Sequence, residues 1–241
     1  YWRYNMMKII TGGVCAAKGF KANGIHCGIR KNKTKKDVAL IYSETMANAA
    51  AVYTKNLVKA APLTVTKAHL ANGKAQAVIC NSANGIEVAE KTSALVAEKL
   101  GINASDVVVA STGVIGQPLD VTPIANGLDA LIAGLGDHST DAAEGIMTTD
   151  TVKKEIAVTF EIGGKTCTMG GIAKGSGMIH PNLATMLVFI TTDCAISSEM
   201  LQKALSADVK NTFNMVSVDG DTSTNDMVSV MANGMAGNEE I

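Results

Sequence analysis

Short apolar runs alternate with stretches of helical periodicity along the chain. The runs are rich in β-branched residues, which predicts buried strands, and they cover residues 38–42, 77–80, 107–110 and 186–190. Helical patterns cover residues 86–100, 123–135 and 197–213. Gly101 and Gly136 follow the first two as stop residues, Asn81-Ser82 is the predicted cap of the first, and Ser197 is the predicted cap of the third.

Residues 155–169 follow a different pattern, with apolar and polar positions in alternation. Gly163-Gly164 interrupts the alternation and predicts a tight hairpin turn. A glycine-rich loop follows at residues 170–177. Hairpins mixed with helices predict an α/β (α+β) layered sandwich, with mixed sheets and helices packed outside, rather than a doubly wound fold.

Composition narrows the class of protein. The chain has 241 residues, 47% of them hydrophobic, and a net charge of −1, which excludes a disordered chain. The even balance of charge also argues against a nucleic-acid binder that works by bulk positive charge. The five cysteines form no CxxC pair, so we expect reduced thiols in a cytoplasmic protein. The longest apolar run is too short to span a membrane.

Several common sites are excluded by their motifs. The glycine-rich loop runs into Pro181, which disfavours the helix that a dinucleotide site needs, and no P-loop sequence occurs. The four histidines are scattered, so no metal site is predicted. Residues 219–226 have the spacing that starts a calcium loop but lack its glycine and closing Glu. We expect a turn there, solvated by its own side chains. No nucleophile elbow is present for a Ser-His-Asp site.

The remaining candidate nucleophile is Thr185, which precedes an apolar strand. A threonine hydroxyl alone is a poor nucleophile because it holds its proton tightly. Cleavage of the backbone between Ala184 and Thr185 would create an α-amine in the same residue. That amine, with a pKa of about 8, could take the hydroxyl proton at neutral pH. The spacing alone is also typical of an ordinary strand threonine.

A set of segments, in order along the chain, resembles the ornithine acetyltransferase family. They are residues 12–30, 81–84, 111–116, 147–151, 174–187 and 219–226, and the longest reads KGSGMIHPNLATML. The resemblance implies an N-terminal-nucleophile, self-processing enzyme of the ornithine acetyltransferase/DmpA-like fold. In this family the precursor cuts itself before the threonine that matches Thr185.

The resemblance also implies a reaction, glutamate N-acetyltransfer in the cyclic arginine pathway. Thr185 would take the acetyl group of N-acetylornithine as an acetyl-threonine ester and pass it to glutamate. Some family members also use acetyl-CoA as a donor, and the resemblance implies no cofactor. Thr112 and Gly113 match the family's oxyanion pair, while Thr151 and Lys174 match its substrate-binding residues. Read by itself, Lys174 is typical of a solvated surface lysine.

The resemblance divides the chain at the cleavage site. Residues 1–184 match the family's α chain, and residues 185–241 match the start of its β chain. Family members continue well past Ile241, where they supply further pocket residues, so we expect a C-terminally truncated match. Their α and β chains form a heterotetramer or a larger assembly. Two alternatives stay open: an N-terminal-nucleophile amidohydrolase or aminopeptidase, and an inactive remnant that acts only in assembly.

Overall fold

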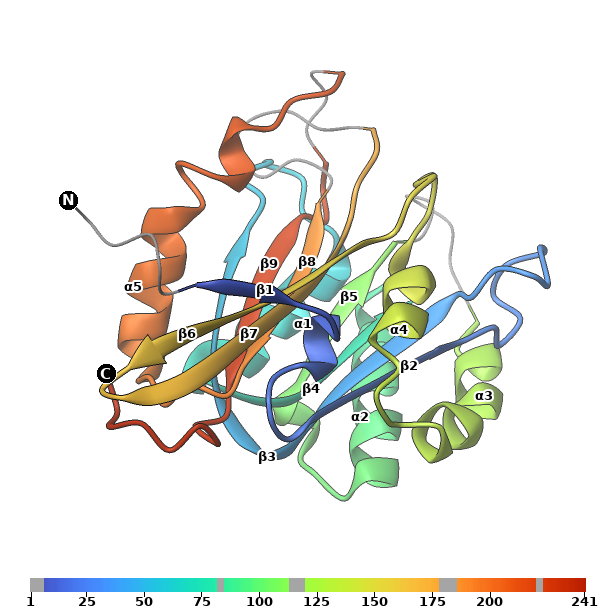
Figure 1. The fold of residues 1–241 in the computed structure, drawn as a ribbon. Coiled ribbons are helices and arrows are strands. Elements are labelled where there is room, and N and C mark those ends of the chain that lie inside the picture. Colours follow the sequence, from blue (N-terminus) through green and yellow to red (C-terminus); the bar gives the residue numbers. More distant parts are fainter. Residues whose placement is uncertain (1–6, 82–84, 113–119, 178–185, 220–222) are drawn as a thin grey trace.

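The computed structural model describes residues 7–81, 85–112, 120–177, 186–219 and 223–241. Within these ranges nine strands form one mixed sheet in the order β1-β6-β7-β8-β9-β3-β4-β5, and β2 pairs with β3 beside this path (Figure 1). The strands are β1 (Lys8–Ile10), β2 (Phe20–Ile25), β3 (Val38–Tyr53), β4 (Lys74–Asn81), β5 (Val107–Ser111), β6 (Lys154–Ile162), β7 (Lys165–Lys174), β8 (Leu187–Thr192) and β9 (Met227–Ala232).

The long strand β3 is shared by two halves of this sheet, one on the side of β4 and β5 and the other on the side of β9. Its first part lies between β2 and β4, and its last six residues, 48–53, pair with β9. The register against β4 shifts between Tyr42 and Ala47. Such an irregularity bends a strand and increases its twist. Strand β3 therefore connects the half formed by β2 to β5 with the half formed by β9, β8, β7, β6 and β1.

A central apolar core lies between the two halves. Ile41 and Val78 of the first half belong to the same buried cluster as Ile172, Phe189 and Met231 of the second. The helix α4 (Ser139–Ile146) contributes small buried side chains to this cluster. The opposite faces of β4, β5, β8 and β9 are buried too, which explains why their sequences read as continuous apolar runs.

Helices cover the outer face of each half. Under α1 (Ala61–His69), α2 (Ile86–Leu100) and α3 (Thr122–Ala133), a second core includes Ile79 of β4 and Val109 of β5. The helix α5 (Ser198–Asp208) covers the other half (Figure 1). Its Leu201 and Leu205 belong to one buried cluster with Val230 of β9. The predicted layered α/β sandwich is confirmed, although the described strands form one folded sheet. One-turn 3-10 helices are η2 (Gly13–Cys15), η3 (Leu70–Asn72), η4 (Ala104–Asp106) and η5 (Phe213–Met215).

Most of the helix signals in the sequence are confirmed. Helix α2 has the predicted bounds, and Gly101 ends it in the left-handed region with φ of 70°. The Ser197 side chain caps α5 by accepting a hydrogen bond from the Met200 amide. The predicted cap of α2 is wrong, because Asn81 ends β4 and Gly85 occupies the N-cap position.

The boundaries of the other two helices differ from the prediction. Helix α3 ends at Ala133, with Gly134 as its C-cap, rather than at Leu135 before Gly136, and α5 ends at Asp208 rather than near residue 213. The predicted hairpin is confirmed, since β6 and β7 pair across Gly163 and Gly164 with φ of 56° and 74°. None of the helices in the described part of the chain is both long and apolar enough to cross a lipid bilayer.

The last strand of the sheet path, β5, is bonded to a helix along its outer edge. The buried Thr66 hydroxyl of α1 donates to the Val109 carbonyl at 2.7 Å and accepts from the Val109 amide at 2.8 Å. The Thr66 side chain thus bonds both the amide and the carbonyl of Val109, with which an additional strand would otherwise pair.

Candidate functional site

Lys174 is the last residue of β7, and its side chain lies inside the protein. Only 4% of the residue is exposed, which excludes the solvated surface lysine that its sequence context alone suggested. The Nζ atom donates a hydrogen bond to Thr148 Oγ1 at 3.3 Å. A buried ammonium is costly unless anions or hydrogen-bond acceptors surround it, so its neighbours are the first evidence of a site.

Charged and polar groups from several elements surround this ammonium. Burial lowers the pKa of Lys174, and the nearby Cys80, Asp150 and Asp226 act in the opposite direction. The guanidinium of Arg30 lowers the pKa further. Burial also raises the pKa of the Cys80 thiol to about 12, so this group is a neutral thiol at neutral pH. The two carboxylates are therefore the anions that favour a charged Lys174.

Asp150 joins the segment before β6 to the end of β7. Its Oδ1 accepts hydrogen bonds from Gly175 N at 2.8 Å and Lys154 Nζ at 2.7 Å, and its Oδ2 accepts from Thr148 N at 3.2 Å. Burial alone would raise the pKa of Asp150, but the bonds from Lys154, Gly175 and Thr148 outweigh it and lower the pKa. Thr149 and Ser176 form a second link, with their hydroxyl oxygens 2.6 Å apart.

Asp226 fixes the start of β8. It is fully buried, and its Oδ1 accepts a hydrogen bond from Met186 N at 2.8 Å. The next amide, Met227 N, donates to the Met186 carbonyl at 3.1 Å. Both backbone groups of Met186, the residue that follows Thr185 in the sequence, are therefore held by the start of β9.

The carboxyl end of β5 lies against the same segment. Asn225 Nδ2 donates to the Ser111 carbonyl at 2.5 Å. Thr112, the next residue, is half-buried, and its amide donates to the Asn81 carbonyl at the end of β4 at 2.7 Å. The expectation of a solvated turn at residues 219–226 is wrong for the described part, because Ser223 and Asp226 are buried and bonded to other elements.

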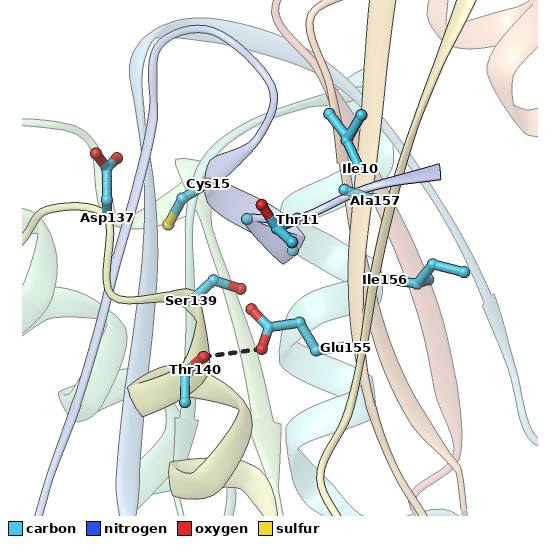
Figure 2. Close-up of a pocket in the computed structure, with 11 residues that line it drawn as sticks. Ile10, Thr11, Cys15, Asp137, Ser139, Thr140, Glu155, Ile156 and Ala157 are labelled. Carbon is cyan, nitrogen blue, oxygen red and sulfur yellow. Dashed lines mark hydrogen bonds between the residues drawn. The ribbon is translucent and has the colours of Figure 1, made fainter. Parts of the chain in front are cut away.

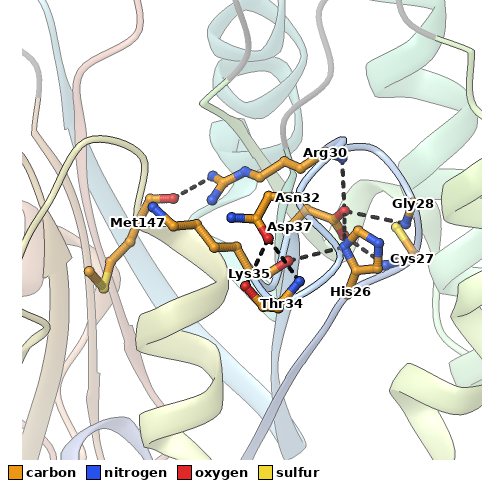
Figure 3. A network of polar contacts seen from close by, with 9 residues as sticks. All are labelled: His26, Cys27, Gly28, Arg30, Asn32, Thr34, Lys35, Asp37 and Met147. Carbon is orange, nitrogen blue, oxygen red and sulfur yellow. Dashed lines mark hydrogen bonds and ion pairs between the residues drawn. The ribbon is translucent and has the colours of Figure 1, made fainter.

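A loop of the first half reaches this region from the other side. Figure 3 shows Asp37 at the centre of the loop of residues 26–37, with Arg30 extending from that loop to donate a hydrogen bond to the Met147 carbonyl. A cavity of about 270 Å³ lies beside Arg30 and is also lined by Thr148 and Asp150. This cavity adjoins the Lys174 ammonium through Thr148.

A larger cavity, of about 530 Å³, lies elsewhere in the fold. Its wall includes Glu155 of β6, Thr140 of α4 and Cys15 of η2, as Figure 2 shows. The Thr140 hydroxyl donates to Glu155 Oε2 at 2.9 Å. The predicted site residues that the structure describes, Thr112, Thr151 and Lys174, do not line it. Among the described residues, no three His, Cys, Asp or Glu side chains are grouped as metal ligands would be.

The structure describes three of the predicted site residues, Lys174, Thr151 and Thr112. Lys174 and Thr151 are brought to the same region by the bonds of Asp150, and Thr151 is exposed at its edge. Thr112 is linked to the 223–226 segment through its neighbour Ser111. Gly113, Ala184 and Thr185 lie outside the described residues.

Asp150, Asp226 and Arg30 are site residues that the sequence reasoning missed. Each stands inside a segment that carried the family resemblance, residues 147–151, 219–226 and 12–30. The sequence therefore contained a signal in these segments, but no spacing rule distinguishes a buried carboxylate from a solvated one.

Comparisons with known proteins identify the relatives of this chain. The sequence model of the ArgJ family matches residues 21–241. The arginine biosynthesis bifunctional protein ArgJ of Listeria monocytogenes is 51% identical, and the match covers 96% of this chain and 60% of that protein. The ArgJ protein of Symbiobacterium thermophilum is 50% identical, over 98% of this chain and 61% of its own length. The chain thus spans about three fifths of the length of these curated relatives.

Solved structures show the same likeness. A crystal structure of ArgJ from Bacillus halodurans superposes with a TM-score of 0.68 at 40% identity, covering 75% of this chain and 98% of that one. Ornithine acetyltransferase from Mycobacterium tuberculosis, solved with ornithine, gives a TM-score of 0.66 at 30% identity, covering 75% of this chain and 100% of that one. The PH0078 protein of Pyrococcus horikoshii, at 13% identity and a TM-score of 0.61, shares the fold alone, covering 94% of this chain and 77% of that one.

Proposed function

Because the chain belongs to the ArgJ family, we propose that it is the part of an arginine-biosynthesis acetyltransferase that carries the nucleophile. The reaction is acetyl transfer from N-acetylornithine to glutamate. One observation carries the proposal beyond family membership: a buried ammonium, Lys174, donates a hydrogen bond to Thr148 and feels the charge of two carboxylates, one of which, Asp226, bonds the start of β8.

The chemistry follows from the residue types. The backbone is cut between Ala184 and Thr185, which frees the α-amine of Thr185 as a base for its own hydroxyl. The hydroxyl oxygen attacks the acetyl carbonyl, the ornithine amine leaves with a proton, and an acetyl-threonine ester remains. The amine of glutamate then attacks this ester, and the hydroxyl of Thr185 is restored. Acetyl-CoA is a second candidate donor for the same ester.

The other predicted residues support the two acetyl-transfer steps. Thr112 and Gly113 supply donors to the oxyanion that develops on the acetyl carbonyl. The donor of Thr112 is its hydroxyl, because its amide is bonded to the Asn81 carbonyl at 2.7 Å, whereas the hydroxyl's bond to that carbonyl is longer, at 3.3 Å. Each such donor is worth about 3–4 kcal/mol in comparable sites. The Lys174 ammonium holds a substrate carboxylate, since it is buried and donor-only and two nearby carboxylates favour its charged form. The exposed Thr151 contacts substrate at the edge of the site.

The proposal includes a division of the precursor. Residues up to Ala184 form an α chain, and Thr185 starts a β chain. The two chains stay together because β7 and β8, on either side of the cut, pair along residues 169–174 and 187–192. Family-type assembly places these two chains in a heterotetramer or larger complex.

Replacing the nucleophile in the complete gene product tests the proposal. We expect Thr185→Ala to abolish both self-cleavage and acetyl transfer, and Thr185→Ser to retain both at a lower rate. Thr64→Ala, on the exposed face of α1, is the matched control and should change neither. Mass spectrometry measures cleavage and the acetyl ester, and chromatography separates N-acetylglutamate from acetate.

Three outcomes would contradict the proposal. Normal processing of the Thr185→Ala variant would exclude the nucleophile. Acetate in place of N-acetylglutamate, with glutamate present, would identify an amidohydrolase. A wild-type protein that is never cut and never acetylated would leave only a role in assembly.

A further inference from the structure

Asp150 links the two predicted substrate-binding residues, Thr151 and Lys174. It directly precedes Thr151 in the sequence, and its Oδ1 accepts a hydrogen bond at 2.8 Å from Gly175 N, directly after Lys174. The Asp150 side chain has no exposed surface. A single carboxylate therefore sets the separation of the Thr151 and Lys174 backbones.

The same carboxylate shapes the turn that receives the Lys174 side chain. Asp150 Oδ2 accepts from Thr148 N at 3.2 Å, and Thr148 Oγ1 accepts from Lys174 Nζ at 3.3 Å. A hydroxyl has one proton and two lone pairs, so Thr148 can accept from Lys174 and still donate to another group. Asp150 is thus connected to the Lys174 ammonium through Thr148, whose amide bonds to Asp150 and whose hydroxyl bonds to Lys174.

Charge adds to this geometric link. The carboxylate of Asp150 is one of the two anions that favour the charged form of the buried Lys174. It is itself held in the ionised form by the bonds from Lys154, Gly175 and Thr148, which outweigh the effect of burial on its pKa. An aspartate in this place keeps a cation charged without bonding to its Nζ, which leaves that atom's other protons available.

We propose that Asp150 is a positioning residue for substrate recognition, which holds Lys174 charged and aimed so that it selects substrates with a free α-carboxylate. The inference rests on the proposed function and deepens it, because it names the recognised group and the residue behind its recognition. Asp150 acts through Thr148 and Lys174 and does not itself touch the substrate.

The test compares N-acetylornithine with its α-carboxamide, which has the same shape but no carboxylate charge. In the complete gene product, we expect Asp150→Asn to raise the KM for N-acetylornithine by roughly 10- to 100-fold, as loss of one charge-assisted interaction does. The kcat should change by less than about threefold, and binding of the carboxamide by less than about twofold. Asp150→Glu, which retains the charge, should restore part of the preference for the acid.

Asp129→Asn is the matched control, because Asp129 on α3 is largely exposed and bonded only at the surface to Lys99. It should leave the preference for the acid unchanged. Equal weakening of acid and carboxamide by Asp150→Asn would show a merely structural role and overturn the inference, as would unchanged KM values. If Asp150→Asn does not fold, Thr148→Val replaces it in the test, since it removes the hydroxyl that Lys174 contacts and nearly retains the shape of the threonine. It should weaken binding of the acid more than binding of the carboxamide, and equal weakening would overturn the inference.

The inference can fail separately from the proposed function. Calorimetric binding of the acid and the carboxamide to the wild-type protein needs no acetyl transfer. A wild type that prefers the acid but transfers no acetyl group would contradict only the proposed function. A wild type that transfers acetyl groups but binds acid and carboxamide equally would contradict carboxylate recognition by Lys174 and the role of Asp150, but not the acetyl transfer itself.

Discussion

Replacing Asp37 by asparagine tests how the loop of residues 26–37 is held in place. The side chain of Asp37 is fully buried. Its Oδ1 accepts from Cys27 N at 2.8 Å, and its Oδ2 accepts from Arg30 N at 3.0 Å and Gly28 N at 3.3 Å (Figure 3). The imidazole of His26 lies 2.9 Å from the same Oδ2. One carboxylate thus organises the loop that carries Arg30 to Met147.

The expected loss follows from these contacts. In the Asp37→Asn variant, the new side chain can keep its oxygen towards Cys27 N, but its amide group then points its own donors at the N–H groups of Gly28 and Arg30. Two charge-assisted hydrogen bonds are lost, each worth about 1.5–3 kcal/mol. We therefore expect the free energy of unfolding to fall by at least about 3 kcal/mol. For a chain of this size that corresponds to a Tm lower by roughly 6–12 °C.

The effect depends on pH in a defined direction. Burial alone would raise the pKa of Asp37, but the bonds from Arg30 and Cys27 and the charge of His26 outweigh it and lower the pKa below its ordinary value of 3.8. A carboxyl group with a lowered folded-state pKa stabilises the protein above its unfolded-state pKa. That contribution is lost as pH falls through the folded-state value. The difference between wild type and Asp37→Asn should therefore be full at pH 7 and shrink below about pH 3.8.

Urea titrations at pH 7 and at acid pH, followed by circular dichroism, measure both parts of this prediction. Asp129→Asn is the control, because its exposed ion pair with Lys99 should contribute less than about 1 kcal/mol. A loss below about 1 kcal/mol for Asp37→Asn would refute the reasoning from hydrogen bonds. A loss of equal size at both pH values would refute the assignment to the ionised carboxylate.

Three further predictions concern stability and thiol reactivity. A Cβ at Gly170 would lie 1.7 Å from the Gly13 carbonyl oxygen, whereas at Gly171 its nearest neighbour is 3.6 Å away. Gly170→Ala should therefore lower the Tm sharply and Gly171→Ala only slightly, and equal Tm values would contradict the close approach of β7 and η2. Thr66→Val should cost about 2–3 kcal/mol in urea titrations, since both Val109 backbone groups lose their bonds, and wild-type stability would refute this. The pKa of each of the five thiols is raised, mainly by burial, so few thiolates are present in the native protein at pH 8. A chromogenic disulfide reagent at that pH should therefore label all five thiols in denaturant but only a few within minutes in the native protein. Rapid labelling of all five in the native protein would contradict this.

The local sequence predicted those helices and strands whose bounds are set by one apolar face or by one glycine turn. The bounds of α2 follow from its apolar stripe and Gly101, and the β6–β7 hairpin follows from alternation and the Gly163-Gly164 turn. The strand β9 was missed because all its residues are buried on both faces, so it shows no alternation. The full length of β3 was missed because exposed polar residues at 44–45 interrupt an apolar pattern that two different partner strands support.

Other elements have weak local signals for a different reason. The helices α1 and α4 are short, and apart from Ile146 the buried residues of α4 are small, such as Ala142 and Ala143, which gives little hydrophobic periodicity. The strands β1 and β2 depend on pairing with β6 and β3, which local sequence does not encode. Their existence is a property of the assembled sheet rather than of their own residues.

The candidate site was predictable by family resemblance but only in part by chemistry. The residue type of Lys174 gave no sign that it is buried, because burial depends on β7, β8 and the segment at 148–150 coming together. The same holds for Asp226, which closes a stretch that reads as a polar turn yet bonds to Met186. The roles of all the predicted site residues stay predictions: Thr185, Ala184, Thr112, Gly113, Thr151 and Lys174.

The pairing of β3 with β9 has a consequence during synthesis. The second half of β3 can bond its partner only after Met227 has left the ribosome, long after Tyr53. At translation rates of about 5–20 residues per second, this interval is roughly 9–35 s. Throughout it, the nascent chain presents an open strand edge of small apolar residues, which favours intermolecular strand pairing. Slower elongation or a lack of chaperones should therefore reduce the yield of native protein more than that of proteins with mostly local contacts.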